Sequence, residues 1–254
     1  MSAVRSSMAG SSALEKTLRI IEELSAPGGP HRLAEVAAAS GVPKSSTYRI
    51  LASLVEQGYA VTDGEGSYGI GLRLRSVAAR VCAERPEGIT ELLEFLHKGT
   101  GHAVHLALRH GAALTYIRKV ESGRPFRSPA RLGMRAALHS TAIGRSVLAH
   151  LPPEEARALC RAAGAPAHAP GELSEVRELG YALDDAEEGT QAGAGAGSGA
   201  VRCLAAPVFG HDGAPVGGIS LTAAAALTTR TELERFSPAL LEAARGVELL
   251  LQRG

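Results

Sequence analysis

The sequence predicts a two-domain protein of the α+β class, in which a small helix-rich domain precedes a larger domain built around a mostly antiparallel sheet. Three observations support this prediction. Two short helical patterns flank a tight turn between residues 32 and 59, a Pro-Glu-Gly break follows at residues 86–88, and strand-like segments dominate beyond it. With 254 residues, the chain is long enough to form two separate hydrophobic cores.

The bulk composition is that of a folded globular protein. Hydrophobic residues make up 45% of the chain and charged residues 21%, and no run approaches the roughly 18 apolar residues that span a bilayer. The N-terminus has no apolar signal core, and three cysteines are too few for a disulfide framework. We therefore expect a cytoplasmic protein with reduced thiols.

The charge balance indicates no partner by itself. The net charge is +1, and residues 1–85 carry ten Lys and Arg against eight Asp and Glu. Proteins that organise DNA structurally depend on neutralising many phosphates, so the near-neutral balance argues against that class.

The N-terminal segment predicts a tail and a first helix. Residues 1–11 are small and polar, which is typical of a frayed tail. Ser11 or Ser12 can cap the helix that follows, together with Glu15. Helical spacing predicts that its inward face carries Leu14, Leu18, Ile21 and Leu24. The Pro-Gly-Gly-Pro run at residues 27–30 ends this helix.

Residues 32–59 predict two more helices joined by a tight turn. The first covers residues 33–40 and ends at Gly41, where a left-handed residue is needed. Pro43 fits the first position of the next helix, because its missing N–H would be unpaired there. This third helix is expected to bury Thr47, Ile50, Leu51, Leu54 and Val55. Its other face carries Lys44, Ser45, Ser46, Tyr48 and Arg49.

An exposed polar face on the second helix of such a pair is typical of helix-turn-helix proteins, which place that helix in the DNA major groove. Arg49 is the candidate for a bidentate contact to guanine, while Lys44 and the two serines are candidates for phosphate contacts. The alternative is a helical hairpin with a solvated polar face. A hairpin turn at Asp63-Gly64 between two short extended segments predicts a wing, which favours a double-stranded DNA operator as partner.

The remaining elements predict the larger domain. Residues 72–85 form a connecting helix, and a further helix covers about 89–99. Four strands are expected, at 102–108, 113–120, 201–209 and 215–223, the last two joined by a hairpin at 211–213. Helices are expected at about 140–150, 153–163, 172–179 and 237–252. The predicted organisation is a disordered tail at 1–11, a winged helix-turn-helix domain at 12–71, a linker helix at 72–88 and a C-terminal domain at 89–254.

Several stretches resemble, in the same order, the IclR (isocitrate lyase regulator) family of bacterial transcription factors. They cover residues 13–24, 33–59, 67–74, 103–108, 119–122, 138–149, 180–185 and 201–209. The resemblance implies that the C-terminal domain is a GAF-like α/β effector-binding domain, and that the protein forms homodimers, often paired into tetramers. It also implies a DNA affinity altered by a small metabolite of unknown identity, with no other cofactor, no metal and no catalytic residues.

The resemblance also implies an effector cavity, lined by Ala136, Leu138, Ala142, Ile143, Asp184, Cys203, Ser220 and Thr222. Ser220 and Thr222 lie two apart on a strand, so their hydroxyls share one face, and the helix start at Ala142 could hold a carboxylate. The alternative is a packed sheet face. Asp184 and Cys203 are nineteen residues apart, a longer spacing than the family usually has, and this leaves the place of Asp184 open.

Three other motifs are weak. The Gly/Ala-rich segment 190–200 imitates a dinucleotide-binding loop at Gly195–Ala200, but a strand follows where a helix is needed. The run Gly218-Ile219-Ser220 lacks the last glycine of a hydrolase nucleophile elbow. His102 and His105 are three apart on a predicted strand, so they should face opposite sides and not share a metal ion.

The expected function is therefore that of a metabolite-responsive transcriptional regulator. Repression is favoured over activation, which is the alternative, because occupying a promoter needs no specific polymerase contact. A GAF-like enzyme that depends on Cys203 is a more distant alternative, since nothing near Cys203 in the sequence supplies a base.

Overall fold

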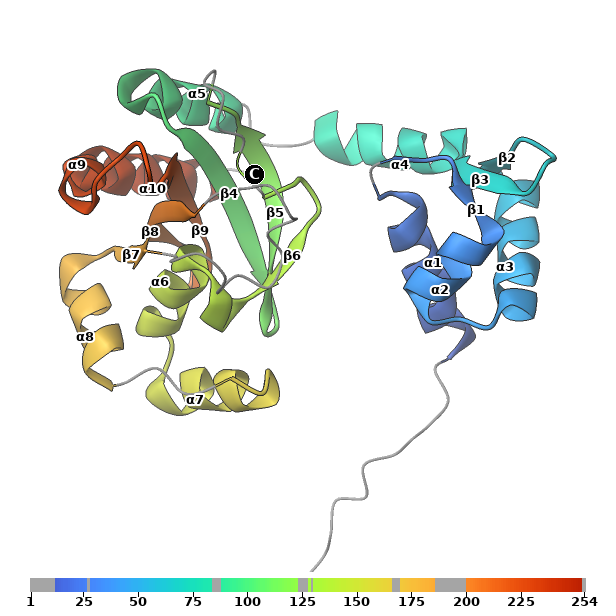
Figure 1. Ribbon diagram of the computed structural model, residues 1–254. Helices are drawn as coiled ribbons and strands as arrows, with labels where there is room; N and C mark the ends of the chain where they lie inside the picture. Colours follow the sequence, from blue (N-terminus) through green and yellow to red (C-terminus); the bar gives the residue numbers. More distant parts are fainter. Residues whose placement is uncertain are drawn as a thin grey trace, which may run out of the picture. The chain divides into compact units, whose positions relative to one another are not determined.

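The computed structural model describes residues 12–26, 28–83, 88–122, 128, 130–165, 170–185 and 200–252. The chain divides into two compact units, residues 1–85 and 86–254 (Figure 1). Outside the described residues lie the predicted tail 1–11, most of the Gly/Ala-rich segment (190–199), and the end of the predicted linker helix (84–87).

The N-terminal unit has the predicted helix-turn-helix and hairpin. Its elements are α1 (Ala13–Leu24), β1 (His31–Arg32), α2 (Leu33–Ser40), α3 (Lys44–Glu56), β2 (Ala60–Thr62), β3 (Ser67–Ile70) and α4 (Leu72–Ala83). Ser12 and Glu15 form a capping box at α1, and Gly41 ends α2 with a φ of 62°. The two-residue strand β1, which pairs with β3, is too short to produce a sequence pattern.

The core of this unit corrects the predicted inward face of α1. Ile20 and Leu24 are buried, whereas Leu14 is 67% exposed and Leu18 is 50% exposed. Leu14, Leu18, Ile20 and Leu24 belong to one wide apolar arc of the helix surface. Only part of that arc packs against the other helices. Helical spacing identifies such an arc but not which part of it a neighbour covers. The predicted burial on α3 is largely met, with Thr47, Leu51 and Leu54 buried.

The C-terminal unit is an α+β fold around a six-stranded sheet in which all the described strand pairs are antiparallel. The strand order is β6-β5-β4-β9-β8-β7. The strands are β4 (Ala103–His110), β5 (Ala113–Val120), β6 (Arg135–Ala137), β7 (Ala182–Asp185), β8 (Val201–Phe209) and β9 (Pro215–Ala224). The helices are α5 (Ile89–Thr100), the 3-10 turn η1 (Leu138–Ser140), α6 (Ala142–His150), α7 (Pro153–Ala162), α8 (Pro170–Leu179), α9 (Arg230–Glu234) and α10 (Ser237–Leu251).

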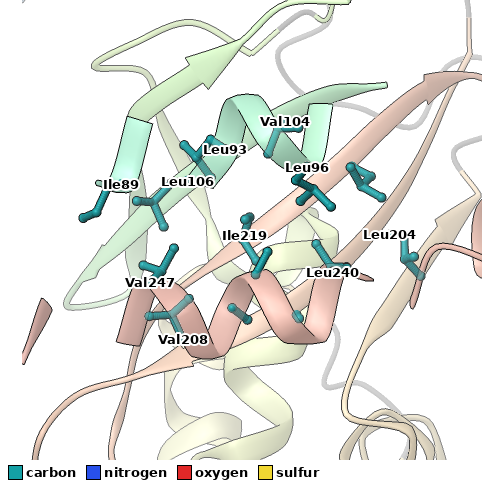
Figure 2. Close-up of a cluster of buried hydrophobic side chains, with 14 of the residues drawn as sticks. Ile89, Leu93, Leu96, Val104, Leu106, Leu204, Val208, Ile219, Leu240 and Val247 are labelled. Carbon is teal, nitrogen blue, oxygen red and sulfur yellow. The ribbon is translucent and has the colours of Figure 1, made fainter. Parts of the chain in front are cut away.

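Each face of the sheet has its own hydrophobic cluster. Leu93 of α5 and Val247 of α10 pack with Leu106 and Ile219 on one face (Figure 2). Ile143 and Val147 of α6 pack against the opposite face. The sheet is therefore covered on both sides, and any site on its second face lies beneath α6.

Candidate functional site

The exposed helix α3 begins one residue later than predicted. Pro43 is the residue before the helix, with φ −52° and ψ 137°, and not its first residue. Its carbonyl accepts a hydrogen bond from the Thr47 amide at 2.9 Å, so it still starts the helix. No side chain among the described residues caps this end, which leaves first-turn amides open to an anion such as a phosphate.

Four of the five predicted DNA-contact residues are exposed on α3: Lys44, Ser45, Tyr48 and Arg49. Ser46 is partly buried and lines a groove between α1 and α3, which Arg49 also lines. Lys16 and Thr17 of α1 line the same groove, so a second basic side chain lies near the predicted contact surface. Reasoning from the helix-turn-helix alone missed these two residues, because α1 lies outside that motif.

The wing is a closed hairpin fastened to α4. The Asp63 carboxylate accepts hydrogen bonds from the amides of Ser67 at 3.0 Å and Glu65 at 2.8 Å, and these bonds lower the pKa of Asp63. The Arg73 guanidinium lies 5.1 Å from the centre of the Tyr59 ring and donates to the Gln57 carbonyl. Arg73 is thus engaged within the fold, where it holds α4 against the base of the hairpin.

A cavity lies on the sheet face that α6 covers. Thr222 of β9 pairs with Cys203 of β8, which pairs with Asp184 of β7, and His105 of β4 pairs with Ser220 of β9. Directly paired residues, and residues two apart on one strand, share a face of a sheet. These five side chains therefore face the same side, where they line a cavity of about 50 Å³.

Seven of the eight predicted cavity residues line this cavity: Ala136, Ala142, Ile143, Asp184, Cys203, Ser220 and Thr222. Leu138 does not. It is 2% exposed and packs in the apolar cluster beneath α6. Its carbonyl oxygen lies only 1.8 Å from where a Cβ on Gly144 would stand, so a glycine is required for η1 to meet α6. Leu138 therefore supports the start of α6 instead of forming cavity wall.

The rest of the lining was not predicted: His105, Tyr116, Ser128, Ala130, Met134, Ser140, Thr141 and Val201. His105 and Ser220 are 115 positions apart, so only the β4–β9 register brings them together. Tyr116 faces the cavity because the pairing of β4 with β5 shifts by one residue between Leu106 and Ala107. Neither the register of β4 on β9 nor the bulge between β4 and β5 can be predicted from the sequence of a single strand.

The longer spacing before Cys203 does not displace Asp184. The Asp184 carboxylate lies 3.1 Å from Arg145 Nη2 of α6, and the same nitrogen donates to the Leu183 carbonyl at 2.7 Å. The next residue, Asp185, pairs with Arg202 at 2.6 Å. Successive aspartates on β7 thus each have an arginine partner, and Asp184 keeps a place in the cavity wall.

Burial shifts the pKa values of three cavity side chains. It lowers the pKa of His105 to about 3, with the Lys119 charge adding to the effect. It raises the pKa of Cys203 to about 11 and raises the pKa of Tyr116 as well. Cys203 Sγ lies 3.4 Å from Thr222 Oγ1, which lies 3.3 Å from His105 Nδ1. The imidazole, thiol and phenol are therefore all neutral at pH 7.

Models of known families match both units. The model described as "IclR helix-turn-helix domain" matches residues 13–64, and the model described as "Bacterial transcriptional regulator IclR C-terminal" matches residues 86–249. The chain belongs to the IclR family. It is therefore a DNA-binding transcriptional regulator and not an enzyme.

IclR-family relatives resemble this regulator along nearly all of its length. The HTH-type transcriptional regulator BhcR of Paracoccus denitrificans is 29% identical over 252 residues, which cover 93% of this chain and 86% of BhcR. The transcriptional repressor IclR of Escherichia coli is 26% identical, with 93% and 89% covered. The crystal structure of Thermotoga maritima IclR matches with a TM-score of 0.65 and 28% identity, covering 94% of this chain and 98% of that one.

Lys119 fastens the wall of the cavity in this IclR-family regulator. Its side chain is 12% exposed, and Nζ donates to the carbonyls of Ser128 at 3.0 Å and Ala130 at 2.6 Å. Glu121 supplies a carboxylate at 2.6 Å. Ser128 and Ala130 line the cavity, so one partly buried ammonium group holds part of the lining against β5.

The weaker motifs form no further site in the described residues. Ser220 lies inside β9 and not at the sharp turn of a nucleophile elbow. His102 precedes β4 and packs edge-on against Phe236, whereas His105 faces the cavity. No group of three or more His, Cys, Asp or Glu suited to a metal ion occurs in this part of the chain. Gly195–Gly199 of the dinucleotide-like motif lie outside it.

None of the described helices has both the length and the apolar character needed to cross a membrane.

Proposed function

We propose that this IclR-family regulator is a repressor whose operator affinity changes when a small molecule binds in the cavity of its C-terminal unit. In this proposal it acts in the cytoplasm as a homodimer, or as a tetramer of two such dimers, on a pseudo-palindromic operator. One observation carries the proposal: Asp184, Cys203, Ser220 and Thr222, from three strands, surround one cavity.

The operator contacts are assigned to the exposed face of α3. Arg49 would read guanine with its two parallel N–H groups, and Lys44 and Ser45 would contact phosphates beside the first-turn amides. The exposure of all three side chains supports these roles. Tyr48, which is 55% exposed, and the groove-lining Ser46 complete the proposed contact surface.

The effector is assigned to the cavity beneath α6. A volume of about 50 Å³ is well below the roughly 300–1,000 Å³ of pockets for drug-sized ligands, which favours a short-chain metabolite. Ala142 and Ile143 contribute apolar wall, while the sheet contributes hydroxyl, thiol and carboxylate groups. This combination suits a small molecule with both apolar and polar parts.

Coupling between the sites requires that the effector bind one arrangement of the protein more tightly than another. We assign the coupling element to α4, which follows the wing in the chain. Arg73 and Arg75 of α4 donate to the carbonyls of Gln57 and Ile70, so a displacement of α4 would act directly on the backbone at the base of the wing.

Footprinting of the promoters beside the gene, with and without candidate metabolites, tests the proposal. Arg49→Ala should weaken protection while leaving metabolite binding intact. Replacing Arg157, an exposed arginine of α7, by alanine should change neither. Protection that no metabolite alters contradicts the effector role. A fall in target expression after deletion of the gene contradicts repression.

A further inference from the structure

The groove between α1 and α3 adjoins the exposed face of α3 and carries positive charge. Its polar lining consists of Lys16, Thr17, Ser46, Arg49 and Ser53. None of the described residues that line it is acidic. Neither Lys16 nor Arg49 forms an ion pair with another described residue. Two like charges therefore share this groove, and an anion bound there would relieve their repulsion.

Lys16 is the residue of α1 that is suited to bind such an anion. The Thr17 hydroxyl donates to the Ala13 carbonyl at 2.8 Å, so its one proton is already used. The Glu15 carboxylate accepts from the Ser12 amide at 2.9 Å, which holds it at the start of the helix. The Lys16 ammonium group has three N–H donors and donates to no other described residue.

The wing carries the opposite charge. Residues 60–70 contain Asp63 and Glu65 and no lysine or arginine. Both acidic side chains are exposed, and the amide hydrogen bonds that lower the pKa of Asp63 keep it ionised at pH 7. DNA phosphates repel a hairpin tip with two negative charges. The wing tip is therefore poorly suited to contact the operator backbone.

The dimensions of DNA place α1 over a backbone strand when α3 enters the major groove. Ile20 of α1 and Leu51 of α3 belong to one hydrophobic cluster, so the two helices pack side by side. Packed helices lie about 8–10 Å apart, and the major groove is about 12 Å wide. A helix beside α3 therefore lies over the phosphates that border the groove and not over the bases.

We propose that α1, and not the wing, grips the operator backbone, with Lys16 binding a phosphate at the edge of the major groove that α3 enters. This contact fixes α3 in the groove while Arg49 reaches the base edges. Lys16 then adds affinity for any duplex and does not affect the choice of sequence. The role of Lys16 rests on the operator contacts proposed for α3.

Fluorescence anisotropy of the full-length protein over a range of salt concentrations tests the proposal. Two labelled duplexes are compared: the fragment protected in footprinting and a shuffled sequence of the same length. Lys16→Gln should make the slope of log K against log salt shallower by about 0.9 for each protomer bound, on both duplexes. Lys16→Arg should keep the wild-type slope. Glutamine forms helices about as well as lysine, and urea unfolding checks that the variant is folded.

Lys98→Gln is the matched control, because Lys98 lies on α5 of the C-terminal unit with a side chain that is 76% exposed. It should leave the slope unchanged, and an equal effect of both lysine variants would mean that net charge alone matters. Glu65→Gln tests the wing and should change the affinity little. The proposal is overturned if Glu65→Gln tightens binding as much as Lys16→Gln weakens it. It is also overturned if Lys16→Gln leaves the slope unchanged or acts on the operator duplex alone.

Arg49→Ala, measured on the same two duplexes, separates the role of Lys16 from the operator contacts proposed for α3. It should reduce the preference for the operator over the shuffled duplex, which Lys16→Gln should retain. If Arg49→Ala keeps the preference while Lys16→Gln lowers the slope, the base contact fails and the role of Lys16 stands. If Arg49→Ala loses the preference while Lys16→Gln keeps the slope, the base contact stands and the grip by α1 fails.

Discussion

Arg202 and Asp185 are register partners on β8 and β7, and Arg202 Nε lies 2.6 Å from the Asp185 carboxylate. Arg202 Nη1 also donates to the carbonyls of Thr228 and Ala225. These contacts fasten β7 to β8 and to the residues after β9. Asp184 consequently stays opposite Cys203 despite the longer chain between them.

The two partners should differ in their contributions to stability. Arg202 is 14% exposed and serves two backbone carbonyls, so Arg202→Met should lower the free energy of unfolding by about 2 kcal/mol. Asp185 is 43% exposed and solvent screens its charge, so Asp185→Asn should cost less than about 1 kcal/mol. Urea unfolding of both variants checks this, and equal losses would show that the carbonyl contacts are unimportant.

Gly144 should tolerate no side chain. A Cβ at this position would meet the Leu138 carbonyl oxygen at 1.8 Å, so η1 and α6 would have to separate. Gly144→Ala should therefore lower the free energy of unfolding by roughly 3 kcal/mol or more, or prevent folding. Gly99→Ala in α5 is the control, since nothing lies within 4 Å of its Cβ and alanine should stabilise the helix by about 0.5–1 kcal/mol. Urea unfolding measures both.

Arg49 should depend on its guanidinium geometry and not just on its charge. Arg49→Ala should weaken operator binding by roughly 1–3 kcal/mol, and Arg49→Lys should recover little of that loss because a lysine cannot make the paired contact. Fluorescence anisotropy with a labelled operator, at fixed salt, measures the effect. Full recovery by lysine would reassign Arg49 to a phosphate contact.

His105 should make the protein sensitive to acid. Its pKa is about 3 in the folded protein, against 6.5 in the unfolded chain, so the unfolded chain binds more protons between these values. Stability is fully present above pH 6.5 and is lost as the pH falls towards 3. Between pH 7 and pH 5 this residue alone should cost about 2 kcal/mol.

Comparison with His105→Gln isolates that contribution, because glutamine does not titrate. Urea unfolding at pH 7 and pH 5 should show a smaller loss in this variant than in the wild-type protein, while His110→Leu should behave like the wild type. The same loss in all three proteins would show that other groups cause the acid sensitivity.

Long elements with a regular pattern could be predicted from the sequence. Helix α3, the hairpin of β2 and β3, and the four longest strands lie within two residues of their expected positions, because apolar periodicity and turn residues mark them clearly. Short edge strands such as β7 have no such signal. They are fixed by pairing with a neighbour, which no local pattern encodes.

The cavity illustrates the same limit at the level of single residues. Ser220 and Thr222 were identified through the resemblance to the IclR family, and the local rule that residues two apart on a strand share a face placed their hydroxyls on one side. His105 was not, since it joins them through the register of β4 on β9. Leu138 was predicted to line the cavity, but it lies in η1, one turn before α6, and its side chain packs in the apolar cluster.

The central pairing of β4 with β9 has a consequence for how the protein is made. These strands are joined by more than half of the C-terminal unit, and contacts between such distant segments form slowly. During synthesis, His105 leaves the ribosome long before Ser220 does, so the cavity cannot close until the chain is almost complete. The helix-turn-helix, whose contacts are local, can fold much earlier. Newly made chains can therefore have a folded helix-turn-helix while the C-terminal unit is still incomplete.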